Sequence, residues 1–500
     1  MSKRYKILIP CGIALAILCS LGTLFFPLSK RADFNDSSIY QYIGYLITKG
    51  KVPYVDAFDH KGIYFYFLNA LGYLINAKWG MWILIIACMS CCIVEIYRTA
   101  SRFLSHKNSI LLTIIIAGGL GTSFWDGDTP DFFAVLFSFI AFDQLSNFFI
   151  NGELNNKDAA IIGLASGIAF WIKPNMILGT LVSCAYVIIF YLVHKNLRAV
   201  WKNILFFALA FIAASLPGVM WLIAKGAFHE MIQDYFLFNM NYVSFYATGA
   251  TRLNALAKFL SLPTVYFLLG CLFIVLFMSL KKWAFDKTDT QLLFCGGLSF
   301  AVCLAHAAMT GNSYEQYAML FYPSILFMLI AIWQVFERLP TRALKSITLI
   351  LAAVILFMTG LKEYRYCKFF WNRVPQEQEI LDYIQDNSNS DDTIAIASPY
   401  YSGYYIATGR DSATKYVYVQ ANHFVNAKDH PEAEEDFWES YTDALLRSKP
   451  RIILYDRQYE SYDGVKLVLN GALKYYTPAG KSSQFEFYVL PRRQDENISG

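Results

Sequence analysis

Two groups of acidic residues lie between the long apolar segments of this 500-residue chain. The first occupies residues 33–40 and 53–62, and the second occupies residues 125–131. A carboxylate can take the proton from an attacking hydroxyl group, and a nearby lysine can stabilise a departing phosphate. Because charges held against a bilayer are costly, the two acidic groups predict a functional site at one face of a membrane.

The composition indicates an integral membrane protein. Hydrophobic residues make up 56% of the chain and charged residues only 16%, against roughly 25% charged residues in soluble domains. The formal net charge is +4, and no basic stripe interleaved with aromatic residues is present. Nucleic acid is therefore not expected as a partner.

About eleven apolar runs are long enough to cross the hydrocarbon core as helices, which takes roughly 17 to 25 residues. They centre on residues 7–27, 79–97, 109–124, 131–149, 159–172, 175–193, 204–224, 259–280, 291–310, 317–336 and 344–361. The sequence therefore predicts a polytopic α-helical membrane protein. Its spanning domain covers residues 1–361, with outer loops at 28–78 and 225–258, and a polar domain follows at 362–500.

Lysine and arginine fall in alternate loops, which indicates the orientation because short cytoplasmic loops are enriched in them. This alternation places the N-terminus in the cytoplasm, and an odd number of spans places both acidic groups and residues 362–500 outside. We expect a multi-pass protein of the cell membrane whose first segment is retained as a signal anchor. The basic residues concerned are Lys3, Arg4, Lys6, Arg98, Arg102, Lys107, Lys157, Lys195, Arg198, Lys202, Lys281, Lys282, Lys287, Arg338, Arg342 and Lys345.

The cysteines offer no disulfide framework. Nearly all of the ten lie inside predicted spans, and only Cys367 borders residues 362–500. The closely spaced Cys88, Cys91 and Cys92 have no accompanying histidine or second pair. Packing within a helix is therefore favoured over metal or redox chemistry.

The outer loops and the tail contain further predicted elements. Residues 37–49 are typical of an amphipathic helix with Asp36 or Ser37 as its N-cap, and residues 63–75 predict a short interfacial helix. In the tail, residues 376–386 and 432–447 predict helices, whereas 393–397 and 451–455 predict buried strands. Alternating helices and strands predict a small extracytoplasmic α/β domain that binds an acceptor or supports the structure.

The order of these features resembles the GT-C superfamily of polyprenyl-phosphate-dependent glycosyltransferases. The resemblance is to its bacterial family 39 branch, which includes protein O-mannosyltransferases and aminoarabinose transferases, and it covers roughly residues 1–340. It rests on Asp36 with Tyr40, on residues 58–62, on the acidic loop at 125–131, on 170–175, and on 314–317 with Pro323. The chain departs from the family pattern at Ser37 and at residues 59–62.

The resemblance implies that Asp36 is the general base of an inverting displacement. Asp59, Asp126, Asp128 and Asp131 are competing candidates for that role. Structural alternatives remain open at this point, because Asp36 and Asp128 could cap helices and residues 126–128 could form a solvated turn.

Candidate binding residues surround these acids. Lys61, Lys173, Arg252 and His60 are candidates for contacts with the donor phosphate, although Lys173 could equally extend to lipid headgroups. The matched motifs suggest Tyr40, Tyr314, Glu315 and Tyr317 as substrate-binding residues. Asp126 and Asp128 form a weak candidate site for Mg²⁺ or Mn²⁺, since hard oxygen ligands suit these ions.

These features together predict a prokaryotic membrane glycosyltransferase. Its donor is expected to be a polyprenyl-phosphate sugar and its acceptor a cell-surface polysaccharide or lipid-linked glycan, with protein as the second choice. The alternative is a membrane transporter or lipid-linked glycan flippase, which would need charges buried within spans and paired broken helices. A glycan-binding sensor is a third interpretation, and the clustered outer acids argue against it.

Overall fold

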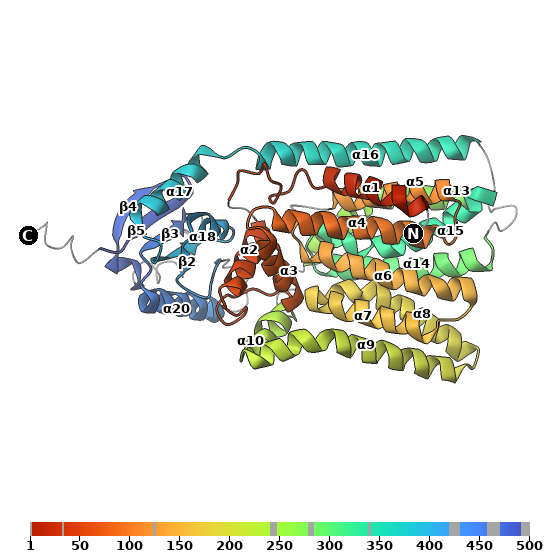
Figure 1. The fold of residues 1–500 in the computed structure, drawn as a ribbon, viewed down its shortest axis with the longest axis horizontal. Coiled ribbons are helices and arrows are strands. Elements are labelled where there is room, and N and C mark those ends of the chain that lie inside the picture. The colour runs from red at the N-terminus through yellow and green to blue at the C-terminus, as the bar shows by residue number, and fades with distance from the viewer. Residues whose placement is uncertain are drawn as a thin grey trace, which may run out of the picture.

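The computed structural model describes residues 3–32, 35–123, 127–240, 248–278, 285–338, 342–419, 431–457 and 471–491. Long helices run side by side in one part of the molecule, and a small module with a β-sheet caps one end of them (Figure 1). Two short helices, α2 (Asn35–Thr48) and α3 (Ile63–Ile75), lie where the two parts meet.

Each of the eleven predicted spans overlaps a helix. These helices are α1 (Lys3–Leu18), α4 (Gly80–Ala100), α5 (His106–Thr122), α6 (Pro130–Asn151), α7 (Asn156–Ile172), α8 (Leu178–Val193), α9 (Leu197–Ala224), α13 (Pro263–Met278), α14 (Lys287–Met309), α15 (Tyr322–Arg338) and α16 (Arg342–Phe370).

In two of the predicted ranges the helix ends early or is broken. Helix α1 ends at Leu18, and a series of turns follows in which the Glu363 carboxylate accepts a hydrogen bond of 2.8 Å from the Gly22 amide. The range 259–280 is broken before Pro263, where α12 (Gly249–Leu260) and α13 meet at a bend of 68°. A proline inside a helix removes one backbone donor, which explains the second break.

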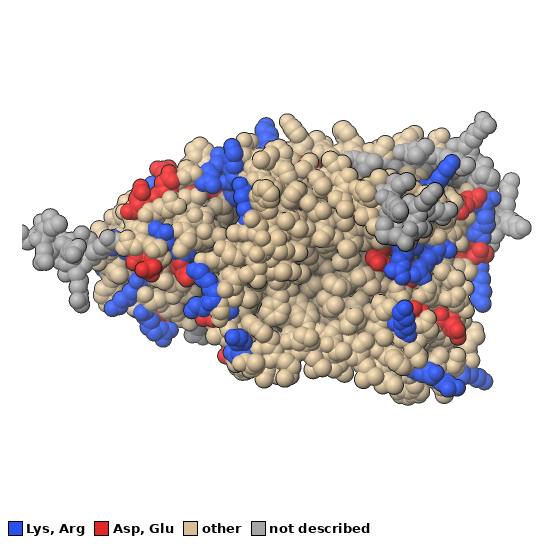
Figure 2. Space-filling model, viewed as in Figure 1, with Lys and Arg blue, Asp and Glu red and all other residues tan. Residues whose placement is uncertain are grey.

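Five helices of the described residues are long and apolar enough to cross a membrane, or six if the bent pair counts as one span. Helices α5, α7 and α15 have 17 residues each, at the lower limit for a span. Figure 2 shows a broad face of the bundle almost without charged side chains, with Lys, Arg, Asp and Glu gathered toward both ends. Eleven spans therefore stay a prediction, while the apolar bundle itself is present.

Helix α2 buries the apolar face that its spacing predicts. Ile39, Tyr40 and Ile43 are at most 2% exposed. The helix begins at Asn35, so the prediction of Asp36 or Ser37 as its N-cap is wrong and Asp36 lies in the first turn. A carboxylate is favourable there, near the positive end of the helix dipole.

The module holds a five-stranded sheet in the order β2-β1-β3-β5-β4, formed by β1 (Thr393–Ala397), β2 (Asp411–Ser412), β3 (Ile452–Asp456), β4 (Thr477–Lys481) and β5 (Phe485–Val489). Strands β1, β2 and β3 are parallel, and β5 pairs antiparallel with β3 and β4. Helices α17 (Pro375–Asn387), α18 (Gly403–Thr408) and α20 (Pro431–Ser448) accompany the sheet. The two helices and two strands predicted in the tail are confirmed.

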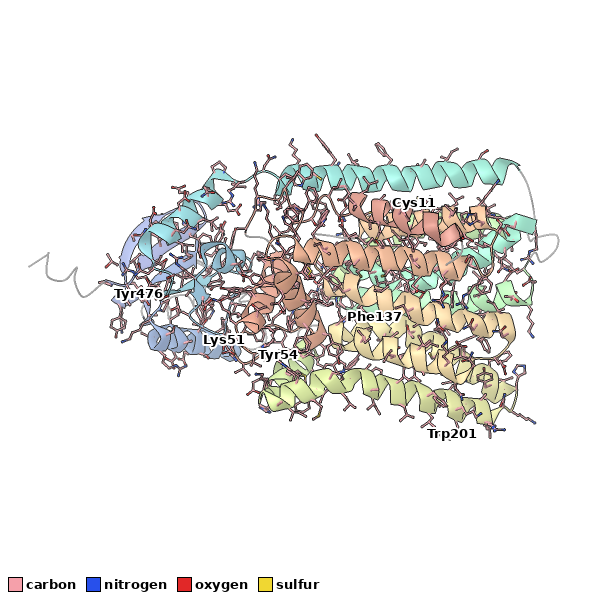
Figure 3. All side chains as sticks on the ribbon, viewed as in Figure 1. Cys11, Lys51, Tyr54, Phe137, Trp201 and Tyr476 are labelled. Carbon is pink, nitrogen blue, oxygen red and sulfur yellow. The ribbon has the colours of Figure 1, made fainter. Side chains whose placement is uncertain are left out.

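Backbone and side-chain hydrogen bonds join the module to the first outer loop. The Phe58 amide donates to the Lys415 carbonyl at 2.7 Å, and the Ser412 amide donates to the Tyr42 hydroxyl at 2.7 Å. Lys51 and Tyr54 of this loop lie at the junction, far from Trp201 at the other end of α9 (Figure 3). No disulfide contributes, because all ten cysteines are free.

Candidate functional site

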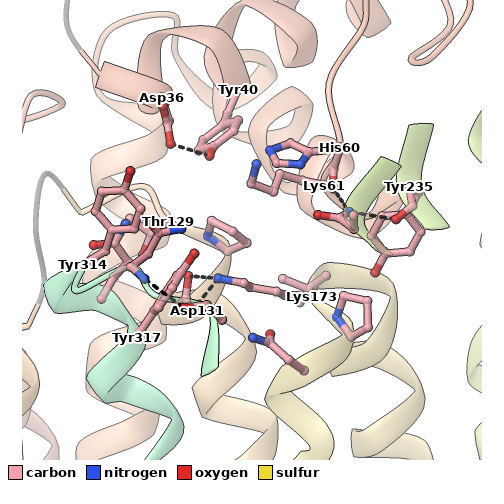
Figure 4. A pocket seen from close by; sticks show the side chains of 18 of the residues that line it. Asp36, Tyr40, His60, Lys61, Thr129, Asp131, Lys173, Tyr235, Tyr314 and Tyr317 are labelled. Carbon is pink, nitrogen blue, oxygen red and sulfur yellow. Dashed lines mark hydrogen bonds and ion pairs between the residues drawn. The ribbon is translucent and has the colours of Figure 1, made fainter. Parts of the chain in front are cut away.

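A cavity of about 400 Å³ lies at the end of the bundle that faces the module, within the range typical of small-ligand sites. Figure 4 shows side chains from both sides converging on it. It is lined by Asp36, Ser37, Tyr40, His60, Lys61, Asp128, Thr129, Pro130, Asp131, Ile172, Lys173, Pro174, Asn175, Tyr235, Phe236, Asn239, Met240, His306, Thr310, Asn312, Tyr314, Gln316, Tyr317 and Tyr400.

Asp36 presents its carboxylate to this cavity. The Tyr40 hydroxyl, one helical turn away, donates a hydrogen bond of 3.3 Å to it. The side chain is exposed because it faces the open cavity, although dense protein surrounds that cavity. The surrounding protein displaces much of the bulk water near this carboxylate, which raises the pKa of Asp36 above its usual value, and the positive charge of Lys61 opposes that shift. A carboxylate with a raised pKa is a stronger base.

The loop before α3 holds Lys61 through its own backbone. The Tyr54 hydroxyl donates to the Lys61 carbonyl at 2.7 Å, and the Lys61 amide donates to the Tyr66 hydroxyl at 3.0 Å. Tyr54 itself adopts a left-handed backbone with φ of +71°. Lys61 Nζ lies 3.7 Å from an Asp59 oxygen and 5.4 Å from the centre of the Tyr40 ring.

Gly62 fixes this loop against the end of α7. A Cβ atom at Gly62 would lie 2.0 Å from the Trp171 carbonyl oxygen, which no other residue type can tolerate without a shift of backbone. The Gly62 amide also donates to the Ile172 carbonyl at 3.2 Å. This contact brings Lys61 and Lys173 to the same cavity.

Lys173 forms a bidentate ion pair with Asp131. Its Nζ lies 2.8 and 2.7 Å from the two carboxylate oxygens and 4.5 Å from the centre of the Tyr317 ring. Helix α7 ends at Ile172 because the residue before a proline, here Pro174, disfavours the helical backbone. The Lys173 ammonium thus contacts a carboxylate of the protein, and its contact with the donor phosphate stays a prediction.

The described residues of the second acidic group, 127–131, are buried. Asp128 is 0% exposed, and the Asn69 amide donates to it at 3.4 Å. The N-cap of α6 is Thr129, whose hydroxyl accepts from the Phe132 amide, so Asp128 does not cap that helix. Gly127 has φ of +97°, a conformation that favours glycine. Asp126 lies outside the described residues.

Of the candidate metal ligands Asp126 and Asp128, only Asp128 lies among the described residues, so a Mg²⁺ or Mn²⁺ site there stays a prediction. The described residues contain no group of three or more His, Cys, Asp or Glu side chains placed to hold a metal ion. Asp128 faces the Asn69 amide, and Asp131 faces the Lys173 ammonium.

Three predicted site residues do not line the cavity. Asp59 is buried behind it and accepts hydrogen bonds from the Tyr66 and Tyr418 hydroxyls at 2.7 and 3.3 Å. Glu315 pairs with Lys362 at 2.9 Å, and Arg252 is exposed on α12. The other nine described candidates all line the cavity: Asp36, Tyr40, His60, Lys61, Asp128, Asp131, Lys173, Tyr314 and Tyr317.

Several lining residues were missed from the sequence. His306 and Thr310 come from the end of α14, where a lone histidine in an apolar run carries little signal. Tyr235 was not missed, because it belongs to the aromatic-rich outer loop 225–258 that predicts contact with lipid or a lipid-linked ligand; it lies in a π-helix (Ile232–Leu237), a feature that often marks functional sites. Tyr400 comes from the module, and its carbonyl accepts a hydrogen bond of 2.9 Å from Ser38.

Comparison with known proteins bears on the fold. A family profile described as "Putative competence-induced protein Ccs4 N-terminal domain" matches residues 2–338. No curated protein matches the chain.

Two solved structures of ArnT from Cupriavidus metallidurans are similar to this chain. The one bound to undecaprenyl phosphate has a TM-score of 0.61 at 10% identity and covers 99% of both chains; the apo structure has 0.62 at 11%, covering 98% of this chain and 100% of its own. The archaeal oligosaccharyltransferase AglB from Archaeoglobus fulgidus, in complex with an inhibitory peptide and a dolichol-phosphate, has 0.56 at 12%, covering 99% of this chain and 75% of its own. At such identities the likeness shows the fold, and the predicted GT-C fold is confirmed.

Proposed function

Because this chain belongs to the competence-induced Ccs4 N-terminal domain family and has a GT-C fold, we propose that it is a membrane glycosyltransferase. It takes a sugar from a polyprenyl-phosphate donor and places it on an extracytoplasmic acceptor, a cell-surface polysaccharide or a lipid-linked glycan. One observation supports this most strongly: an accessible carboxylate, Asp36, and a lysine, Lys61, face the same cavity. The ArnT and AglB neighbours were solved with undecaprenyl phosphate and dolichol-phosphate.

The proposed reaction is a single inverting displacement. Asp36 accepts the proton of the acceptor hydroxyl while that oxygen attacks the anomeric carbon of the sugar. The bond between the anomeric carbon and the phosphate oxygen breaks, and its electron pair leaves with the polyprenyl phosphate. Asp36 later releases its proton to solvent through the open cavity.

Lys61 is the better phosphate ligand of the two cavity lysines. Lys173 already makes a close contact with both oxygens of Asp131, whereas Lys61 lies 3.7 Å from its nearest carboxylate oxygen. An ammonium group that has donors left for an anion stabilises the charge that develops on a leaving phosphate. His60, the neighbouring residue, also lines the cavity.

The cavity faces the extracytoplasmic side in this proposal. It lies at the module end of the bundle, while Arg98 lies in the last turn of α4 and Arg102 follows that helix, at the end predicted to be cytoplasmic. The N-terminus is then cytoplasmic and the module, which contributes Tyr400 to the cavity, is extracytoplasmic.

The test uses the full chain in nanodiscs with undecaprenyl phosphate carrying different sugars and a membrane glycan extract as acceptor. Release of undecaprenyl phosphate that depends on the acceptor supports the proposal. Asp36→Asn should reduce that release about 10² to 10⁴-fold, the usual contribution of a general base. Asp391→Asn, which removes an exposed carboxylate of the module, is the matched control. Full activity of Asp36→Asn would reassign the base, and no release with any donor would support a transporter instead.

A further inference from the structure

Asp59 lies behind the cavity and joins three parts of the chain through one carboxylate. It is 2% exposed and stands two residues before Lys61, on the loop that precedes α3. Its Oδ2 accepts a hydrogen bond of 2.7 Å from the Tyr66 hydroxyl of α3. Its Oδ1 accepts one of 3.3 Å from the Tyr418 hydroxyl of the module and lies 3.7 Å from Lys61 Nζ. The proposed reaction does not use this carboxylate.

Helix α3 connects the Asp59 carboxylate to the backbone of Lys61. The Tyr66 hydroxyl donates to Asp59 and at the same time accepts from the Lys61 amide at 3.0 Å. A hydroxyl group can do both, because it has one donor and two acceptor lone pairs. The position of the carboxylate is therefore tied to the position of the Lys61 main chain.

The sheet of the module holds Tyr418 in place from both sides in sequence. The Val417 carbonyl accepts a hydrogen bond of 2.8 Å from the Ser402 hydroxyl, and the Val419 amide donates to the Ser398 carbonyl at 2.9 Å. Ser398 directly follows β1. Tyr418 itself is 2% exposed, so its hydroxyl reaches the outer loop from a fixed backbone.

A second contact fixes the same loop to the same segment of the module. The Phe58 amide donates to the Lys415 carbonyl at 2.7 Å, and the centre of the Phe58 ring lies 6.1 Å from that of Tyr418. The two consecutive residues Phe58 and Asp59 thus both contact residues 415–418. A functional side chain keeps its geometry when the residues around it are locked by packing and hydrogen bonds.

Lys61 is oriented by Asp59 and remains available to a ligand. The distance of 3.7 Å between Lys61 Nζ and Asp59 Oδ1 is longer than the roughly 3.2 Å limit of a good N–H···O hydrogen bond. The charges therefore attract each other, while the ammonium keeps donors for a second anion. Lys61 lines the cavity, to which it points from the same loop as His60 (Figure 4).

We propose that Asp59 and Tyr418 are positioning residues for Lys61, so that the module is part of the donor-phosphate site. The Tyr418 hydroxyl orients the Asp59 carboxylate, and the carboxylate orients the Lys61 ammonium toward the phosphate. The inference rests on the proposed function, because that function assigns Lys61 to the phosphate of the donor. The module then has a role in donor binding that is separate from any contact with the acceptor.

The first experiment measures binding of radiolabelled undecaprenyl phosphate to the detergent-solubilised full chain, without a sugar donor or an acceptor. Tyr418→Phe keeps the ring and the charge of Asp59 and removes only the hydroxyl. The dissociation constant should rise about 3- to 10-fold, in line with the loss of one hydrogen bond. Tyr476→Phe is the matched control, because it removes another buried hydroxyl of the module, one that donates to the Pro450 carbonyl at 2.9 Å. Equal constants for the two variants would overturn the inference.

Asp59→Asn separates positioning from simple charge. Removing a negative charge 3.7 Å from the ammonium would by itself strengthen the binding of an anion, because more positive charge then faces it. Loss of the orientation of Lys61 has the opposite sign. We expect the second effect to dominate and the dissociation constant for undecaprenyl phosphate to rise about 3- to 30-fold. Unchanged or tighter binding would show that Asp59 does not position the lysine.

A double-mutant cycle with Lys61→Gln separates positioning from a general loss of structure. Lys61→Gln should weaken binding of the lipid, and Tyr418→Phe should then cause no further loss, since residues that act through one another are not additive. The same loss from Tyr418→Phe with and without Lys61 would indicate a structural effect and overturn the inference. If Lys61→Gln binds the lipid as well as the unaltered chain does, Lys61 is not a phosphate ligand and the inference falls with it. Acceptor-dependent release of undecaprenyl phosphate, and its loss in Asp36→Asn, still decides the transferase separately.

Discussion

Helix α6 carries two buried, ion-paired carboxylates, of which one lines the cavity and the other lies in a network of protein donors. Asp131 lies in its first turn, at the cavity, and Asp143 lies twelve residues later, about 18 Å along the helix axis. Asp143 accepts from Arg102 and Gln144, each at 2.8 Å, and Arg98 approaches to 3.2 Å. Asp131 has one basic partner among the described residues, Lys173, and an open cavity beside it.

The two ends of α6 therefore serve different purposes. Around Asp143 several donors of the protein converge on one carboxylate, and such a network rigidifies the helix ends that it connects. Around Asp131 the two charges of the ion pair neutralise each other, while the Asp36 carboxylate nearby is turned to the cavity. Polar groups that the protein leaves for a ligand mark the functional end.

The largest stability effect is expected at the cavity end. Lys173→Met removes the partner of Asp131, whose side chain is only 3% exposed, and should destabilise the protein by about 3 to 5 kcal/mol. Thermal unfolding of the detergent-solubilised protein measures the loss. The double variant Asp131→Asn/Lys173→Met should recover most of it, because no buried charge is then left alone. No recovery would mean that the pair is not the main interaction of either residue.

A smaller stability loss is expected at the opposite end of the helix. Asp143→Asn should cost about 1 to 3 kcal/mol, since Arg98 and Arg102 are partly exposed and can be hydrated when the charge is lost. The kcat and KM of the folded fraction should stay unchanged, which separates this residue from those of the cavity. A kinetic defect in correctly folded Asp143→Asn protein would break the contrast between the two ends.

The pH dependence of kcat/KM tests whether Asp36, at the cavity end, acts as the base. Burial raises the pKa of Asp36, and Lys61 opposes the rise. Asp36 acts as a base only when ionised, so kcat/KM should fall as pH decreases through a pKa above that of free aspartic acid. Lys61→Gln removes the opposing charge and should move this acid limb to higher pH. Lys51→Gln, which alters an exposed lysine of the same loop, should leave the limb in place.

The raised pKa of Asp36 also predicts whether this residue stabilises or destabilises the fold at a given pH. A carboxyl whose pKa is higher in the folded than in the unfolded state stabilises the fold below its unfolded pKa, and this contribution is lost as pH rises through the folded pKa. Ionised Asp36 therefore disfavours folding at neutral pH, and Asp36→Asn should not lower the unfolding midpoint. A clear drop in that midpoint would indicate a structural role.

The smallest effect is expected from the module. Tyr400→Phe keeps the ring at the cavity and removes only the hydroxyl, so KM for the acceptor should rise about 2- to 10-fold, in line with one hydrogen bond. The kcat value should change little. Tyr475→Phe, on an exposed part of the module, is the control. An unchanged acceptor KM would show that the Tyr400 hydroxyl does not contact the acceptor.

The helices and the tail strands were predictable because their signals are local. Long apolar runs locate each helix, and Ile394 and Ile396 are buried in β1 as their apolar run predicts. Helix ends were less predictable: the turns after Leu18 depend on Glu363, which is 341 residues from Gly22 in sequence. The candidate acids and lysines were recognisable from their residue types beside apolar segments.

The sequence by itself determined that charged side chains such as Asp36, Lys61 and Lys173 lie at the ends of apolar helices, because burying them in lipid would cost too much free energy. Only the tertiary structure decided that Lys173 pairs with Asp131, that Glu315 pairs with Lys362, and that His306 and Tyr400 reach the cavity. These contacts join residues 42 to 362 positions apart. Such pairings depend on how the helices pack, which no local pattern of residues encodes.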